Sequence, residues 1–143
     1  MPEFLAELKA ESLKVLYPDR TIISADTIVL VGKEILNKPV DKAEAIQMLR
    51  KLSGKMHEVI TGVCILKNDA KHLFSDTTEV YFKDLSDREI EHYVEKFKPY
   101  DKAGAYGVQE WIGYIAVEKI IGCFYNVMGL PVNKVYKILT HVG

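Results

Sequence analysis

Two long runs rich in β-branched and aromatic residues constrain the fold of this chain more than any other feature. They cover residues 56–66 and 71–83, and only residues 67–70 separate them. Residues of this kind favour strands, and a short polar connection between two such runs favours a hairpin. The sequence therefore predicts a long antiparallel hairpin in the middle of the chain.

Helical patterns flank this hairpin on both sides. Pro2 suits the first turn of a helix, and apolar residues recur at helical spacing after it. Asp41 with Glu44, and Ser86 with Glu89, have the spacing of a capping box, so Asp41 is assigned to capping and not to catalysis. Helices are predicted at residues 2–16, 41–52, 86–97 and 131–139. Residues 21–25 and 28–31 are predicted to form one strand or two, and further short strands are predicted at 35–36 and 114–118.

Length and charge limit the classes of function. The 143 residues fit one domain of ordinary size. Nineteen basic and twenty acidic side chains give a net charge of −1, which provides no general attraction to nucleic acid or to an anionic membrane. No apolar segment approaches the roughly 18 residues of a membrane span, and the first residues lack the basic region of a secretory signal. We expect a cytoplasmic protein without nucleic-acid or membrane partners.

Cysteine and histidine spacing does not indicate a metal centre. Cys64 and Cys123 form no C-x-x-C pair, which predicts buried free thiols in a reducing environment. Neither a Walker G-x-x-x-x-G-K-[ST] sequence nor a G-x-G-x-x-G sequence is present, which argues against P-loop and Rossmann nucleotide binding. Four scattered histidines lack the spacing of a zinc site, namely His57, His72, His92 and His141.

Residues 21–27 are the first candidate for chemistry. Ile22 and Ile23 predict a short strand, and the following residues, up to Thr27, are small and polar. Because α/β folds place ligand chemistry at strand ends, Asp26 is predicted to be a functional carboxylate in a turn. The alternative is that Asp26 only caps the turn by accepting hydrogen bonds from nearby backbone N–H groups.

Two lysines are further candidates. Lys38 precedes Pro39, which favours an extended backbone and lets the ammonium project from a loop. A phosphate ligand and a plain surface lysine are both consistent with this position. Lys9 lies within the first predicted helix, where the residue pattern alone indicates a solvated side chain.

Residues 99–109 are too rich in glycine for a regular element and predict a ligand-facing loop. Glycines let backbone N–H groups approach a phosphate or a base closely. Lys102 and Gln109 are the candidate substrate-binding residues of this loop, since a glutamine can pair with a base edge. The alternative is a structural turn with a surface ion pair between Asp101 and Lys102.

Five stretches of the sequence, in order, resemble the motifs of the Maf family of nucleotide pyrophosphatases. They are S-A-D-T at residues 24–27, K-P at 38–39, L-S-G at 52–54 with His57 and T-G-V at 61–63, D-K-A-G-A-Y-G-V-Q at 101–109, and N-V-M-G-L-P at 126–131. The resemblance implies a cytosolic α/β protein related in fold to the inosine-triphosphate pyrophosphatases, with a mixed twisted sheet flanked by helices in one domain over residues 1–143. It also implies hydrolysis of dTTP- or UTP-type nucleotides to monophosphate and pyrophosphate with a divalent metal, Mg²⁺ or Mn²⁺.

The resemblance also assigns roles by position. Asp26 matches the family's essential carboxylate, described as a general base or as a residue supporting the metal. Lys38 matches a catalytic phosphate-binding lysine, and Lys9 falls where the family has a second one. Thr27 and Gln109 match positions linked to base selection in the branch that prefers dTTP and UTP.

One family motif is not found in this sequence. Family members begin with a strand and an S-x-S-P-R-R loop, so the resemblance predicts that a segment of about 50 residues is missing from the domain. That loop would supply a serine and two arginines for the triphosphate, whereas the arginines of this chain lie outside the motifs, at Arg20, Arg50 and Arg88. An incomplete triphosphate pocket and impaired activity are therefore expected.

The sequence is consistent with two other functions. The family was first described through inhibition of septum formation, so a non-catalytic nucleotide-binding regulator of cell division is one alternative. A homodimer formed through an exposed sheet edge is the other, because unpaired strands readily pair with a second chain.

Overall fold

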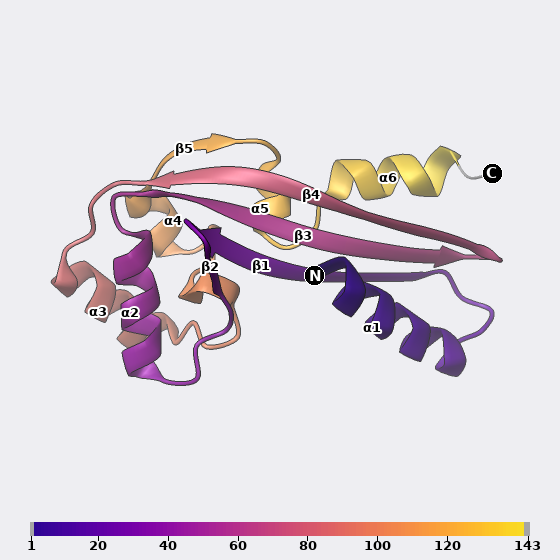
Figure 1. Cartoon of the computed structure of the whole chain (residues 1–143), viewed down its shortest axis with the longest axis horizontal. Helices are drawn as coiled ribbons and strands as arrows, with labels where there is room; N and C mark the ends of the chain where they lie inside the picture. The colour runs from indigo at the N-terminus through magenta and orange to yellow at the C-terminus, as the bar shows by residue number, and fades with distance from the viewer. Residues whose placement is uncertain (1, 142–143) are drawn as a thin grey trace. The chain divides into compact units, whose positions relative to one another are not determined.

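Helices and strands are interspersed along the chain (Figure 1). The structure, a computed structural model, describes residues 2–141. Its elements are α1 (Pro2–Leu16), β1 (Ile22–Val31), β2 (Glu34–Leu36), α2 (Lys42–Leu52), β3 (Met56–Lys67), β4 (Ala70–Phe82), α3 (Asp87–Phe97), the 3₁₀ turn η1 (Ala103–Ala105), α4 (Trp111–Ala116), β5 (Val117–Ile121), α5 (Phe124–Val127) and α6 (Val132–His141). The predicted α/β composition is confirmed.

The strands form one five-stranded sheet in the order β2-β1-β3-β4-β5. Only Asn68 and Asp69 connect the neighbouring strands β3 and β4, so these strands form the antiparallel hairpin that the sequence predicts. Asn68 has a φ of 55°, the left-handed conformation that tight hairpin turns require. β1 pairs antiparallel with β2, and β4 pairs antiparallel with β5.

The described residues form two compact units. The first unit holds residues 2–27, 60–77 and 123–141, and therefore α1, α5 and α6. The second unit holds residues 28–59 and 78–122, and therefore β2, α2, α3, η1, α4 and β5. β1, β3 and β4 contribute residues to both units, and the single domain expected over residues 1–143 stays a prediction.

In the first unit, α1 and α6 cover opposite faces of β3 (Figure 1). Side chains alternate between the two faces of a strand. Cys64 and Leu66 pack with Ala6 and Ala10 of α1 in one apolar cluster. Val63 and Ile65 pack with α6 in another, whose members from α6 are Val135, Ile138 and Leu139.

In the second unit, α2 packs on α3 and on η1. The N–H of Glu44 donates to Asp41 Oδ1 at 2.9 Å, which confirms that Asp41 caps α2. Ser86 and Glu89 form the complete capping box predicted at the start of α3. The side chains buried in this unit include Leu49, Leu52, Ile90, Tyr93 and Ile112.

The turn predicted around Asp26 is wrong, because β1 runs without interruption from Ile22 to Val31. The polar residues do not end the strand, since their side chains find partners on both faces of the sheet. Asp26 meets Lys9, and Thr27 meets Thr61. The functional candidates of this segment therefore lie within a strand and not in a loop.

The strand predicted at residues 114–118 is shifted along the chain. Tyr114 to Ala116 end α4, and the strand β5 begins at Val117. Ile112 and Ala116 are both fully buried, and their spacing of four residues places them on one face of a helix. Burial of this face explains why the helix continues to Ala116.

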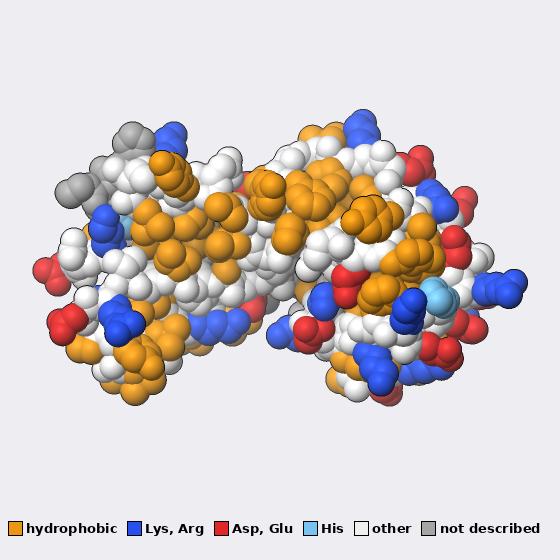
Figure 2. Space-filling view, turned by 180° about the vertical axis from the view of Figure 1, so that it is seen from behind, with side chains coloured by type: hydrophobic (Ala, Val, Ile, Leu, Met, Phe, Trp, Pro, Cys, Tyr) orange, Lys and Arg blue, Asp and Glu red, His pale blue; other side chains and the backbone are white. Residues whose placement is uncertain are grey.

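Several large hydrophobic side chains lie at the surface. Figure 2 shows hydrophobic groups in several places on the face that it presents. Among the exposed residues of α1 and α6 are Phe4, Val15, Leu16 and Tyr136. No helix among residues 2–141 is long and apolar enough to cross a membrane, and the homodimer expected from an open sheet edge stays a prediction.

Candidate functional site

Asp26 and Lys9 meet in the first unit. Ile22 of β1 belongs to the apolar cluster under α1, and alternation along the strand places Asp26 on the same face. Lys9 Nζ lies 3.2 Å from Asp26 Oδ1. The side chain of Asp26 is 19% exposed and that of Lys9 is 54% exposed, so a shielded carboxylate faces a solvent-accessible ammonium. The solvated lysine that the residue pattern indicated is therefore an ion-pair partner of the first candidate carboxylate.

The donor set around Asp26 fits a metal that is also held by substrate. No group of three or more His, Cys, Asp or Glu side chains that could hold a metal occurs among residues 2–141. Mg²⁺ commonly binds through one or two carboxylates together with water and substrate phosphate oxygens. Lys9 contacts Oδ1 of Asp26, and none of the described residues donates a hydrogen bond to Oδ2. Asp26 could therefore offer Oδ2 to a metal ion that takes its other ligands from substrate phosphate and water.

Thr27 points to the opposite face of β1, where it joins a chain of polar contacts. Its Oγ1 lies 2.9 Å from Thr61 Oγ1. The Thr61 hydroxyl donates to the main-chain carbonyl of Asn126 at 3.2 Å, and Asn126 Nδ2 donates to the carbonyl of Asp76 at 3.1 Å. Thr61 and Asn126 lie in the T-G-V and N-V-M-G-L-P stretches, but neither received a role from the sequence, because no local pattern shows which side chains meet across strands.

Lys38 and the 99–109 segment come together in the second unit. The N–H of Gly104 donates to the carbonyl of Asn37 at 3.2 Å, which ties the two loops. A hydrogen bond from Lys102 is the main cause that lowers the pKa of Asp101, and the nearby charge of Lys38 adds to it. The side chains of Lys38 and Gln109 are both exposed.

Lys102 is engaged by carboxylates of its own loop. Its Nζ lies 3.1 Å from Asp101 Oδ1 and 4.0 Å from Glu110 Oε1. The surface ion pair with Asp101 that the sequence suggested as the structural alternative is therefore present. Of the candidates from this segment, Gln109 is more exposed to a ligand than Lys102.

Two buried aromatic residues support the same segment. Tyr93 Oη donates to Glu110 Oε1 at 2.5 Å and accepts the N–H of Gly107 at 3.1 Å. Tyr106 Oη lies 2.6 Å from Nε2 of His57, and both rings pack edge-on against Phe82. Through these contacts Tyr93 of α3, His57 of β3 and Phe82 of β4 anchor the segment, a role that could not be assigned from their positions in the sequence.

The buried His57 predicts a specific pH dependence of stability. Burial lowers the pKa of His57 to about 4, whereas an unfolded chain takes up the proton near its ordinary value of about 6.5. The unfolded state therefore binds more protons between these values, and the free energy of unfolding falls by about 3 kcal/mol as the pH drops from 6.5 to 4. Above about pH 6.5 this histidine has no effect on the free energy of unfolding, because it is neutral in both states. Urea unfolding between about pH 4 and 6.5 measures the free energy of unfolding of the wild type and of His57→Gln. If this free energy falls equally with pH in both proteins, the role given to His57 is contradicted.

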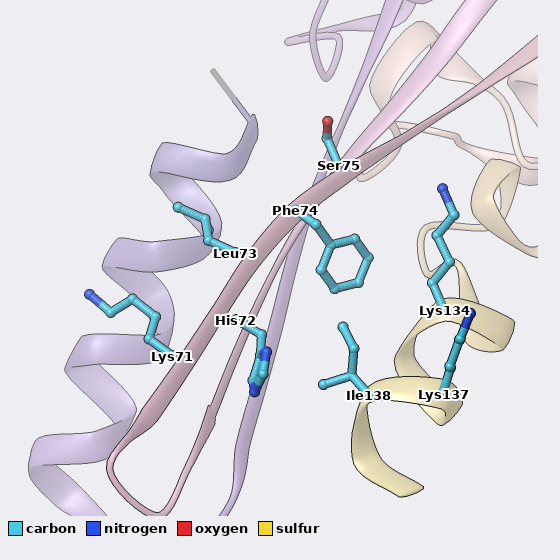
Figure 3. Close-up of a pocket in the computed structure, with 8 residues that line it drawn as sticks. All are labelled: Lys71, His72, Leu73, Phe74, Ser75, Lys134, Lys137 and Ile138. Atoms are coloured by element: carbon cyan, nitrogen blue, oxygen red, sulfur yellow. The ribbon is translucent and has the colours of Figure 1, made fainter. Parts of the chain in front are cut away.

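A separate cavity of about 520 Å³ in the first unit does not contain these candidates. Figure 3 shows Phe74 and Ile138 facing each other across it, with Lys71 pointing away toward α1. Lys71 pairs there with Glu7 and Glu11. Lys134 at the other side pairs with Asp76 at 2.7 Å. Because these lysines are neutralised, the cavity offers weaker attraction to phosphate than the number of lysines indicates.

Known proteins resemble the chain over nearly all of its length. A family model described as Maf-like protein matches residues 1–142. A relative from Cytophaga hutchinsonii, named dTTP/UTP pyrophosphatase, is 54% identical over 134 residues, which is 94% of this chain and 62% of the relative. A protein of the same name from Porphyromonas gingivalis is 51% identical over 146 residues, covering 100% of this chain and 73% of the relative. The chain thus spans about two thirds of the length of these relatives.

Proposed function

Because this chain belongs to the Maf-like protein family, we propose that it takes part in the hydrolysis of dTTP and UTP between the α- and β-phosphates. The products are the nucleoside monophosphate and pyrophosphate. The single observation that carries this proposal is about 50% identity, over nearly the whole chain, to relatives named dTTP/UTP pyrophosphatase. The contact between Lys9 and Asp26 supports it with chemistry suited to phosphate.

Asp26 and Lys9 act together in the proposed reaction. Water must attack the α-phosphorus in line with the leaving pyrophosphate, and the developing negative charge must be stabilised. The ammonium of Lys9 is exposed and supplies positive charge beside the carboxylate. The Asp26 oxygen that Lys9 does not contact has one of two roles in this proposal. It accepts the proton of the attacking water as a general base, or it binds a cation that the substrate phosphates also bind.

A divalent cation belongs to this proposal, and Asp26 is the residue that would hold it. Mg²⁺ or Mn²⁺ would neutralise phosphate charge when bound together with the nucleotide. The protein contributes one shielded carboxylate, which suits an ion that takes its remaining ligands from phosphate and water.

The remaining candidates lie in the second unit. We assign Lys38 to a phosphate, since its side chain is exposed next to Pro39 and carries a positive charge. Gln109 is assigned to the base, because an exposed amide can donate and accept at a base edge. Lys102 is also assigned to the substrate, and to bind it the ammonium must leave its ion pair with Asp101.

The proposal is tested by identifying products and the bond that is cleaved. The chain is incubated with dTTP, UTP, CTP and GTP in the presence of Mg²⁺ or Mn²⁺, and equal amounts of monophosphate and pyrophosphate are expected from dTTP and UTP. An analogue with a methylene between the β- and γ-phosphates should still be cleaved, and one with a methylene between the α- and β-phosphates should not.

Two results would decide against this function. Release of the nucleoside diphosphate together with inorganic phosphate would show that the bond between the β- and γ-phosphates is cleaved instead. Binding of dTTP in calorimetry without turnover above the Asp26→Asn background would favour the non-catalytic nucleotide-binding alternative.

A further inference from the structure

We propose that Thr61 is a positioning residue that fixes Thr27 as a hydrogen-bond acceptor, so that the substrate group meeting Thr27 is an N–H or O–H of the nucleoside. This inference rests on the proposed function, and it adds the kind of group that Thr27 recognises. All residues involved belong to the first unit.

The proton of the Thr61 hydroxyl is committed to a carbonyl. Thr61 Oγ1 lies 3.2 Å from the main-chain oxygen of Asn126. A carbonyl oxygen only accepts hydrogen bonds, so Thr61 must be the donor in this contact. Thr61 and Asn126 are both fully buried, which keeps water from replacing either partner.

The remaining contact then fixes the direction of the Thr27 hydroxyl. A threonine hydroxyl has one proton and two lone pairs. Because the proton of Thr61 is used, Thr27 donates across the 2.9 Å contact between the two hydroxyl oxygens. The reverse arrangement forms one hydrogen bond fewer and leaves the Thr61 and Asn126 oxygens 3.2 Å apart without a proton between them.

The rest of the contact network keeps this arrangement in place. The N–H of Gly129 also donates to the Asn126 carbonyl at 3.0 Å, and Asn126 Nδ2 holds the carbonyl of Asp76 at 3.1 Å. A Cβ at Gly129 would lie 3.7 Å from Thr27 Oγ1, so glycine there keeps side-chain atoms away from the hydroxyl. Thr27 thus presents its lone pairs to a ligand, and Gly129 places no side chain beside them.

An acceptor at this position selects among the parts of a nucleotide. Ionised phosphate oxygens only accept hydrogen bonds, so the triphosphate is not what Thr27 binds. Thymine and uracil carry a donor at N3, whereas cytosine carries an acceptor there, and the sugar carries a donor at its 3′ hydroxyl. Either donor satisfies Thr27, and a base with an acceptor at this place is rejected because two lone pairs then face each other.

The test compares substrates that differ in a donor across variants that differ in one hydroxyl. The kinetic constants kcat and KM are measured for dTTP, for 5-methyl-dCTP and for 2′,3′-dideoxy-TTP with the wild type, Thr61→Val and Thr61→Ser. We expect the wild type and Thr61→Ser to prefer dTTP about tenfold or more over the analogue that lacks the relevant donor. Thr61→Val, which is matched in shape, should lose most of that preference through KM while kcat stays within about threefold.

The two analogues identify the source of the donor. Loss of selectivity against 5-methyl-dCTP alone assigns the donor to the base, and loss against the dideoxynucleotide alone assigns it to the sugar. Thr27→Val should lose the same preference for dTTP as Thr61→Val, and the double variant should lose no more than either single variant. Thr27→Val therefore provides a second test if Thr61→Val folds poorly.

Two outcomes would overturn the inference, and they are distinct. Wild-type selectivity that survives in Thr61→Val for both analogues shows that Thr61 does not set the role of Thr27, while the proposed function stands. A wild type that neither binds nor hydrolyses dTTP removes the proposed function and this inference with it.

Discussion

Asp26→Asn is expected to lower kcat/KM for dTTP by about a thousandfold, which corresponds to about 4 kcal/mol of lost transition-state stabilisation. Asparagine has nearly the same shape but neither carries the charge that pairs with Lys9 nor accepts a proton from water. The loss therefore falls on the chemistry proposed for this carboxylate. Release of pyrophosphate at saturating and limiting dTTP separates kcat from KM.

The same substitution should leave the stability of the fold almost unchanged. Lys9 is more than half exposed, and exposed ion pairs contribute at most about 1 kcal/mol. Asp69→Asn, in the exposed turn between β3 and β4, is the matched control and should alter neither activity nor stability. A fall in the urea midpoint that accounts for the lost activity, or an active Asp26→Asn enzyme, would contradict the role given to Asp26.

Gly62→Ala is expected to cost about 3 kcal/mol of unfolding free energy, a large loss for a single methyl group. A Cβ on Gly62 would lie 2.2 Å from the main-chain nitrogen of Glu3 and 2.4 Å from the carbonyl carbon of Pro2. Backbone atoms cannot rotate away as the end of a side chain can, so α1 must shift. Because α1 also carries Lys9, the variant should lose activity along with stability.

Gly32→Ala separates this clash from strain in the backbone. Gly32 has a φ of 59° and no atom within 4 Å of an added Cβ, so its replacement should cost only the left-handed conformation, about 1–2 kcal/mol. Gly62 is not at a positive φ, and its cost is steric. Urea unfolding of both variants measures the two terms, and a smaller loss for Gly62→Ala than for Gly32→Ala would show that α1 moves easily.

Local patterns predicted the parts of the fold that local forces determine. The β3–β4 hairpin follows from two strand-forming runs and a short turn, and the caps at Asp41 and Ser86 follow from side chains that bond to backbone three residues away. The turn predicted at Asp26 is wrong, because the polar side chains of β1 are satisfied by residues from α1 and β3. No pattern confined to residues 21–27 contains that information.

The sequence by itself determined the chemical groups of the candidate residues. These are a carboxylate at Asp26 and an ammonium group at Lys9 in the first unit, and an ammonium group at Lys38 and an amide at Gln109 in the second unit. It also determined the family, through motifs that extend along nearly the whole chain. Only the tertiary structure decided that Lys9, 17 residues before Asp26, lies 3.2 Å from it. It likewise decided that Thr61 directs the proton of Thr27, because side chains on different strands become neighbours only when the sheet has formed and its two faces have been covered.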